Sequence, residues 1–308
     1  MFIHFLGWIC YAEKTHPFVL PYISNVKSPQ QIQGRLIKSY LAAKLDIAPS
    51  TIYHLSIMPC YDKKLEASRE SFFEGGVRDV DCVISTLELD RLLSEKSLGR
   101  TFAEFAAKPL SPLFSNVNNT ADFTIMYGAP GNASGGYLEY ILRYASKELS
   151  KSQEDIDVPM KKGCSIKVIR NSDCREITVH LSDKETMTFA AVYGFRNIQN
   201  FIRKLKTGKC RYDYVEVMAC PGGCINGGGQ LRPDDQLMDN ITEWTKRVNS
   251  KYSDDTVAPR YADENDHVSM LIHEWLGGWN TEIAMSSLKT SYKAVEPLST
   301  VSALHTEW

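Results

Sequence analysis

Hydrophobic positions follow two different periods along this chain. Short apolar runs of the kind that form buried strands occur at residues 52–58, 79–84, 166–168, 177–179, 188–193 and 214–219. Apolar residues at helical spacing occur at residues 28–45, 87–93, 134–149 and 197–206. Strands that alternate with helices predict an α/β fold with mainly parallel sheets.

Several of these predicted helices begin or end at residues that favour such boundaries. Ser28 is a good N-cap, and Pro29 is a good first helical residue. Ser85 and Glu88 fit a capping box at the start of the next helix. Gly208 ends the helix that begins near residue 197. These signals support the helix assignments independently of the apolar pattern.

Beyond the last predicted strand the pattern changes to helical spacing alone. Residues 95–132 read as a long loop or insertion, and residues 151–162 as a charged linker. Helices are expected at residues 237–248, 268–276 and 283–292. The predicted organisation is an α/β domain at 1–232, a helical segment at 233–293 and a flexible C-terminal tail at 294–308.

Composition and charge exclude several classes of protein. The chain has 308 residues, 43% hydrophobic and 23% charged, which is ordinary for a globular protein. A net charge of −2 gives no sign of a nucleic-acid or anionic-membrane partner. No apolar run approaches the ~20 residues that a bilayer needs. The apolar start, Met1–Ala12, has no basic residue before it, so we expect an interior core segment rather than a secretory signal.

The eight cysteines are spread along the chain, which is typical of reduced thiols in the cytosol with a subset doing chemistry. Cys220 and Cys224 lie in a loop with five glycines that follows the apolar run at 214–219. Glycine N–H groups can donate hydrogen bonds to sulfur or to a bound iron–sulfur cluster. The plainer interpretation is a glycine-rich turn that happens to hold two cysteines. Two close thiols in an intracellular protein favour metal binding or redox chemistry instead.

A third candidate thiol, Cys60, follows Pro59 at the end of another predicted strand, with Lys63 and Lys64 just beyond it. Cations near a thiolate lower its pKa and favour metal binding. For lysine pairs in general, solvation of a helix start is the commoner role. Ligands of open α/β sheets bind outside the carboxyl ends of the strands, so Cys60 can meet the two cysteines of the glycine-rich loop.

Three segments of the chain resemble the motifs of iron-only hydrogenases. Val217–Gln230 is similar to the last active-site motif of these enzymes, Met58–Ala67 to the second, and Gly7–Gln31 to the first. The resemblance extends from Gly7 to about Tyr292. It implies two α/β lobes with the metal site between them, and a helical segment that wraps the catalytic domain.

The resemblance also assigns individual residues. It implies that Lys63 faces the active-site cavity. It places Phe5 where the family carries a cluster-binding cysteine. Cys60, Cys220 and Cys224 match the other ligands, so they are the predicted metal and cofactor ligands of this chain.

Within that superfamily the chain is closer to the nuclear prelamin A recognition factor-like (Nar) family. The segments that carry this likeness are residues 8–14, 61–68, 78–82 and 193–200. The Nar family binds two four-iron clusters, one through an N-terminal cysteine segment and one through four cysteines of the hydrogenase-like domain. This chain lacks the N-terminal segment and has Phe5 in place of one ligand. We therefore expect an N-terminally truncated form with one 4Fe–4S cluster and no fourth thiolate.

The implied function is a cluster-binding adaptor or carrier in cytosolic iron–sulfur protein assembly. The expected location is the cytoplasm, with the nucleus as a second site, and the expected partners are apo iron–sulfur client proteins. The family also implies that the assembly targeting complex reads an acidic residue followed by a terminal Trp, here Glu307 and Trp308. Thr306 stands where an aliphatic residue is usual.

Three alternatives remain open from the sequence. The first is an active hydrogenase, which needs the thiol that Phe5 replaces and a proton-relay thiol beside it; we expect no such activity and no catalytic residue. The second is a zinc protein that uses the same three thiols. The third is a lamin-binding relative of the same family.

Overall fold

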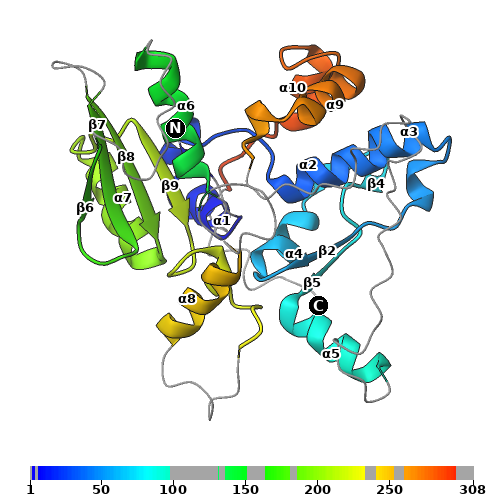
Figure 1. Ribbon diagram of the computed structural model, residues 1–308, viewed down its shortest axis with the longest axis horizontal. Coiled ribbons are helices and arrows are strands. Elements are labelled where there is room, and N and C mark those ends of the chain that lie inside the picture. The colour runs from blue at the N-terminus through cyan, green and yellow to red at the C-terminus, as the bar shows by residue number, and fades with distance from the viewer. Residues whose placement is uncertain are drawn as a thin grey trace, which may run out of the picture.

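Two α/β lobes make up the part of the chain that the computed structural model describes, residues 2–3, 6–97, 131, 136–150, 164–180, 186–232, 241–252 and 260–295. A five-stranded sheet forms the first lobe, on the left of Figure 1. Strands β2 (Leu55–Met58) and β5 (Cys82–Ser85) form the second lobe, on the right. This arrangement agrees with the predicted two-lobed α/β fold.

The five-stranded sheet has the order β1-β9-β8-β7-β6. Its strands are β1 (Phe2–Ile3), β6 (Cys164–Val168), β7 (Cys174–His180), β8 (Thr186–Tyr193) and β9 (Tyr214–Met218). Strand β9 pairs in parallel with β1 and β8, whereas β7 pairs antiparallel with β6 and β8. The antiparallel half departs from the expected parallel pattern because only about five residues join β6 to β7 and β7 to β8, too few for a crossover helix.

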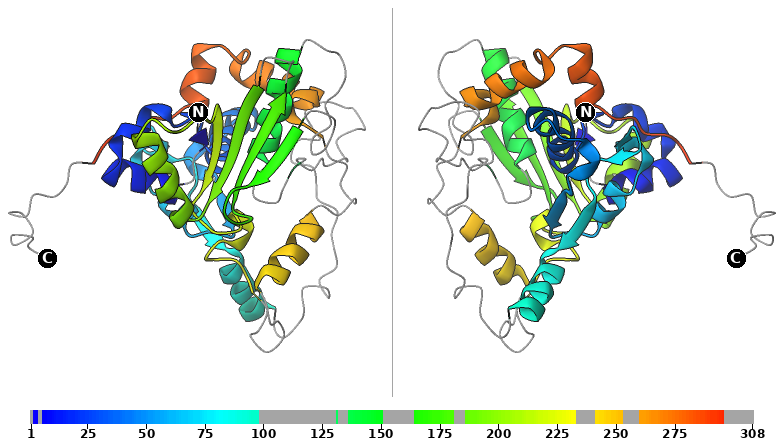
Figure 2. Two further views of the ribbon diagram at one scale, coloured as in Figure 1. Left: turned by 90° about the vertical axis from the view of Figure 1, so that its left-hand side faces the viewer. Right: turned by 90° about the vertical axis from the view of Figure 1, so that its right-hand side faces the viewer.

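Helices cover both faces of this sheet. Helices α1 (Leu6–Thr15) and α7 (Phe195–Lys206) lie on one face, and α6 (Tyr137–Ser150) lies on the other, as Figure 2 shows. Strand β9 is buried along its whole length, as expected of a strand covered on both sides. On α1, Trp8 and Ile9 are fully buried, so the described part of the apolar start is core, as predicted.

The second lobe packs short helices around β2 and β5, which pair in parallel. These are α2 (Pro29–Arg35), a π-helix (Leu36–Leu41), α3 (Ala42–Lys44), α4 (Asp62–Ala67) and α5 (Thr86–Lys96). The Ser28 hydroxyl caps α2 by accepting a hydrogen bond from the Gln31 amide at 3.3 Å. The capping box of Ser85 and Glu88 is present at the start of α5. Both predicted helix starts are therefore confirmed.

The C-terminal part is helical, as predicted, with α8 (Ile241–Tyr252), α9 (Asp266–Leu276) and α10 (Glu282–Leu288). The last helix ends at Leu288 rather than at Tyr292. Residues 289–295 instead form an extended strap. The Thr290 amide donates to the carbonyl of Asn25 at 2.7 Å, and the Val295 amide donates to that of Glu13 at 3.0 Å. These bonds fasten the end of the helical segment to the first lobe. The predicted domain boundaries themselves stay a prediction.

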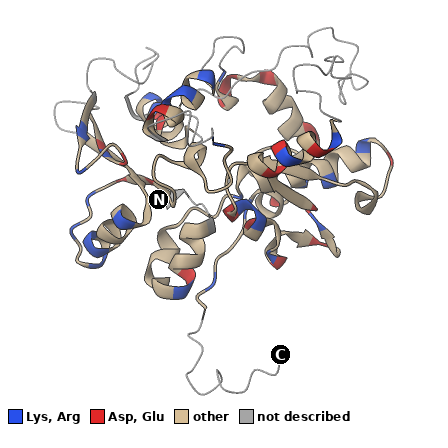
Figure 3. Ribbon diagram, turned by 90° about the horizontal axis from the view of Figure 1, so that it is seen from below, with Lys and Arg blue, Asp and Glu red and all other residues tan. Residues whose placement is uncertain are grey.

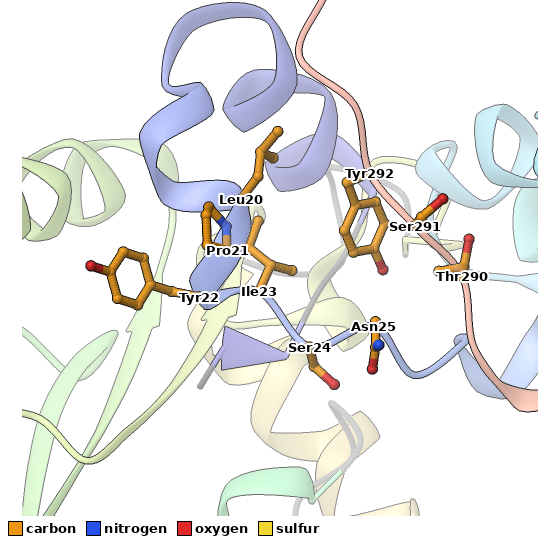
Figure 4. A pocket seen from close by; sticks show the side chains of 9 residues that line it. All are labelled: Leu20, Pro21, Tyr22, Ile23, Ser24, Asn25, Thr290, Ser291 and Tyr292. Carbon is orange, nitrogen blue, oxygen red and sulfur yellow. The ribbon is translucent and has the colours of Figure 1, made fainter. Parts of the chain in front are cut away.

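A cavity of about 740 Å³ lies between this strap and residues 20–25. Figure 4 shows that its lining is made of hydroxyl, amide and apolar side chains from the two segments. Its lining contains no cysteine, so it is separate from the candidate thiol site. Among the described helices, none has the length and apolar character needed to cross a bilayer.

Candidate metal centre

Cys60 lies at the carboxyl end of β2, where the chain turns into α4. The Cys60 carbonyl accepts a hydrogen bond from the Lys63 amide at 3.3 Å, which closes this turn. The Asp62 amide donates to the Cys60 sulfur. A strand end and a helix start thus fix the position of the first thiol.

Cys220 and Cys224 lie in the glycine-rich loop (Cys220–Gln230), which leaves the carboxyl end of β9. Gly222 and Gly223 have φ angles of 73° and 81°, a left-handed conformation that favours glycine. Their turn is closed by the Gly223 amide, which donates to the Cys220 carbonyl at 3.1 Å. A 3-10 turn (Cys224–Asn226) follows and brings Cys224 to the inner side of the loop.

The glycine-rich loop packs directly against the backbone beside Cys60. The Gly229 amide donates to the carbonyl of Pro59 at 3.0 Å. A Cβ atom at Gly227 would lie 2.3 Å from the same oxygen and 3.0 Å from the Cys60 Cβ. Only glycine allows this approach, so Gly227 brings the two strand ends together from different lobes.

The three thiols interact with one another. A hydrogen bond between the thiols of Cys60 and Cys220 raises the pKa of Cys60 and lowers that of Cys220. The Gly228 amide also donates to the Cys220 sulfur, which lowers the pKa of that thiol further. Burial raises the pKa of Cys224 to about 12, the ammonium of Lys63 opposes this, and Cys60 adds to it. The convergence at the strand ends is thus observed, while the role of these thiols as metal ligands stays a prediction.

The two lysines beyond Cys60 have different surroundings. Lys63 is buried, and its ammonium pairs with Glu66 at 2.7 Å while acting on Cys224. Lys64 is half-exposed and pairs with Glu88 of α5 at 2.8 Å. Lys63 therefore lies on the thiol side and Lys64 on the solvent side of α4. Lys63, which the family resemblance assigned to the active-site cavity, is thus the lysine that lies near the thiols.

Asp62 is a residue of the site that sequence reasoning missed. Its carboxylate accepts a hydrogen bond from the Gly7 amide at 3.0 Å, at the start of α1. Its charge also helps to raise the pKa of Cys60, Cys220 and Cys224. It therefore joins the first turn of α1 to the thiol site.

A buried carboxyl group, Glu216, is a second residue that was missed. It lies in the middle of β9 and is fully buried. The Tyr193 hydroxyl and the Leu138 amide, the latter at 2.9 Å, donate to its two oxygens. Burial raises its pKa to about 7. The signal was present in the sequence, because Glu216 is the only charged residue in an apolar run.

Other predicted residues have different positions. Phe5 and Trp308 lie outside the described residues. Cys10 packs against the apolar core between α1 and the sheet. Each of the seven cysteines whose side chains are described is free.

A single-ion site is not preformed in the described part of the chain. There, no three His, Cys, Asp or Glu side chains gather closely enough to hold one metal ion. Zinc needs its ligand atoms within about 2.3 Å of one point. A four-iron cluster holds each thiolate at a different iron, so its ligands lie farther apart.

Comparison with known families and structures confirms the class of protein. Residues 6–228 match the family described as iron only hydrogenase large subunit, C-terminal domain. A structure of the [FeFe]-hydrogenase HydA1 from Chlamydomonas reinhardtii has a TM-score of 0.77 at 28% identity, covering 96% of this chain and 76% of that one. The structure of HydA(deltaEFG) has the same TM-score at 29% identity and the same coverage. The fold is thus that of iron-only hydrogenases.

Curated relatives narrow this class. The cytosolic Fe-S cluster assembly factor narfl of Xenopus tropicalis is 42% identical over 98% of this chain and 60% of its own length. Its namesake in Danio rerio is 43% identical over 98% of this chain and 70% of its own length. Cytosolic iron-sulfur assembly component 3 of Mus musculus is 44% identical, with coverage of 98% and 60%. The chain belongs to the iron-only hydrogenase-like family, in the branch of these cytosolic Fe-S assembly factors. It spans about 60% of the length of the Xenopus and mouse relatives.

Proposed function

We propose that this chain is an iron–sulfur cluster-binding component of cytosolic iron–sulfur protein assembly. The observation that carries the proposal is the meeting of three thiols from two lobes, in a family whose curated members are named as assembly factors. It acts as an adaptor or carrier that delivers clusters to apoproteins.

Cys60, Cys220 and Cys224 would hold the 4Fe–4S cluster through their thiolates. The chemistry of the donor set fits this group. The amides of Asp62 and Gly228 donate to two of the sulfurs, and such bonds stabilise a thiolate ligand. Bound, the cluster supplies a redox-active or transferable iron–sulfur unit. Because position 5 carries Phe rather than Cys, water or another ligand would complete the fourth iron.

This role needs no hydrogenase activity. Curated relatives carry assembly-factor names, although the fold neighbours are hydrogenases. Phe5 replaces a thiol ligand with an apolar ring. We expect no hydrogen turnover by purified, iron-replete protein. Reproducible turnover that is lost in Cys224→Ala would establish the hydrogenase alternative instead.

The assembly role is tested in cells depleted of the endogenous relative. Expression of the chain should restore radioactive iron incorporation into a cytosolic 4Fe–4S client, while a mitochondrial client serves as the unaffected control. The triple variant Cys60→Ser, Cys220→Ser, Cys224→Ser should not restore it. Equal rescue by the triple variant would show that these thiols are not needed for assembly.

The C-terminus supplies the proposed docking signal. Glu307 and Trp308 resemble the acidic residue and terminal Trp that the targeting complex reads, and Trp is a favoured anchor at interfaces. Deletion of Trp308 should abolish pull-down of that complex and leave the thermal unfolding midpoint unchanged. A lower midpoint with intact pull-down would show that Trp308 packs on its own domain instead. Interaction with this complex places the protein in the cytoplasm, with the nucleus as a second site.

A further inference from the structure

A second cavity lies on the first lobe, away from the thiols. It has a volume of about 430 Å³ and opens between α7, the turn from β6 to β7, and the loop that precedes β9. Cationic side chains from two of these elements line it: Arg170, Arg203 and Lys204. Its volume falls within the range of small-molecule sites, about 300–1,000 Å³.

The three cations outnumber the carboxylates near them. None of the three cations forms an ion pair within the described part of the chain. Two acidic residues, Asp173 and Glu176, lie near the cavity, and their charges oppose those of Lys204 and Arg170 at Cys174. Asp173 accepts a hydrogen bond from the Gly222 amide at 2.8 Å, and Glu176 bonds the Tyr212 hydroxyl. With three cations against two carboxylates, the cavity keeps a net positive charge.

The thiol of Cys174, which lines the cavity, does not add a negative charge to balance the cations. Cys174 is half-buried, and burial raises the pKa of its thiol against the opposing charges of Lys204 and Arg170. At neutral pH it is a neutral, weakly polar group. An anion from outside the chain can therefore supply the ion pairs that the three cations lack.

The rest of the lining suits an aromatic ring. Phe201 and Tyr212 line the cavity with their rings stacked, 6.5 Å between centroids. The Lys204 ammonium lies 5.8 Å from the centre of the Tyr212 ring. The Asn200 amide adds a polar group beside the cations, whereas the NH2 group of Asn197 already donates to Asn171 and to the Tyr193 carbonyl. The cavity thus combines a ring-sized apolar wall with donors for an oxyanion.

Helix α7 concentrates this charge. It contains Arg196, Arg203, Lys204 and Lys206 and no acidic residue. Figure 3 shows that elsewhere in the molecule Lys and Arg are mixed with Asp and Glu. The apolar residues of α7 face the sheet core, so its basic residues are left at the cavity and in solvent. Arg196 and Lys206 are exposed, as are the three cavity cations, but they do not line the cavity, which makes them matched controls.

From this geometry we propose that the cavity binds the phosphate groups of a small phosphorylated molecule of nucleotide size. Guanidinium groups match phosphate oxygens in pairs of hydrogen bonds, and a diphosphate offers enough negative charge for three cations. The half-buried Tyr212 ring receives the base, since Phe201 is itself buried in the core. This site is independent of the thiol centre and of the assembly role.

The test is calorimetric titration of the full chain with ADP. We expect saturable binding of one ADP per chain. The double variant Arg170→Gln, Arg203→Gln should weaken it at least ~10-fold, since each lost ionic contact is worth about a factor of ten. The double variant Arg196→Gln, Lys206→Gln removes the same charge from the same lobe and should change it less than ~2-fold. Thermal unfolding checks that each variant is folded.

Three outcomes would overturn the proposal. In the first, ADP does not bind saturably. In the second, both double variants weaken ADP binding equally, which means that ADP is attracted diffusely to a basic surface. In the third, a glutamate-rich peptide binds and ADP does not, so the cavity belongs to a protein-docking face. A second readout is alkylation of Cys174, followed by mass spectrometry. ADP should slow it in the wild-type chain while leaving alkylation of the half-buried Cys82 unchanged.

Discussion

At the scale of single residues, the candidate metal centre depends on a contact between two backbones. The Pro59 carbonyl of one lobe and Gly227 of the other lie so close that no side chain fits between them. Neighbouring Gly228 differs, because a Cβ there would meet only the Tyr61 ring at an ordinary 3.4 Å. Alanine substitutions at these two adjacent glycines therefore distinguish the loss of this contact from the general effect of an added methyl group.

Gly227→Ala should destabilise the protein by about 2–4 kcal/mol, because the added Cβ must push the glycine-rich loop away from Cys60. Gly228→Ala should cost less than about 1 kcal/mol. Urea unfolding of both variants measures the difference. Equal destabilisation would mean that the close approach at Gly227 does not constrain the lobes.

Glu216 is the residue whose titration should appear in the stability of the protein. Its pKa is raised to about 7 in the fold, from 4.5. Between these values the folded chain holds a proton that the unfolded chain has released, so stability falls as pH rises through this window. The loss reaches about 3 kcal/mol above pH 7, from 1.36 kcal/mol for each pKa unit.

The Glu216→Gln variant should remove this loss. Its amide oxygen can accept from the Leu138 amide and its NH2 group can donate to the Tyr193 hydroxyl, so both contacts persist without an ionisable group. The variant should be more stable than the wild type at pH 8 and show little difference between pH 5 and pH 8. Urea unfolding of the apo protein at both pH values gives the result, with the exposed Glu243→Gln as the control that leaves the pH difference intact. Identical pH profiles for wild type and Glu216→Gln would refute the assignment.

At the scale of elements, the periodicity of the sequence predicted the strands that lead to the thiols, β2 and β9, and the amphipathic helix α7. It missed α1, whose first turns are apolar on every side and so show no helical face. It also missed the π-helix at Leu36–Leu41, because its apolar spacing resembles that of an α-helix. The antiparallel β6 and β7 follow from short connections, which the alternation of strands and helices does not reveal.

The capping box at the start of α5 is an element-level prediction that the structure confirms. The Ser85 hydroxyl accepts from the Glu88 amide at 3.1 Å, and the Glu88 carboxylate accepts from the Ser85 amide at 2.7 Å. Ser85→Ala should lower the free energy of unfolding by about 1 kcal/mol. Ser94→Ala, in the exposed interior of the same helix, should be neutral. A cost for Ser94→Ala equal to that for Ser85→Ala would show that the cap is not responsible.

At the scale of the whole molecule, the two lobes meet at the ends of β2 and β9, and the candidate ligands come from both. The sequence motifs identified the three thiols, because the family resemblance spans nearly the whole chain. The motifs did not identify Asp62 or the contact of Gly227 with Pro59. These depend on how the lobes pack, with partners far apart in the sequence. The resemblance thus identified the candidate ligands, and the structure shows the surrounding groups that change the pKa values of these thiols.

The most direct test of the account is the cluster content of the chain after anaerobic reconstitution with iron and sulfide. The account predicts visible absorption and about four iron and four sulfide per chain. It predicts loss of both in Cys60→Ser, Cys220→Ser and Cys224→Ser, but not in Cys82→Ser. Zinc bound in place of iron, with no visible absorption, or a cluster that survives all three substitutions at the thiol site, would contradict it.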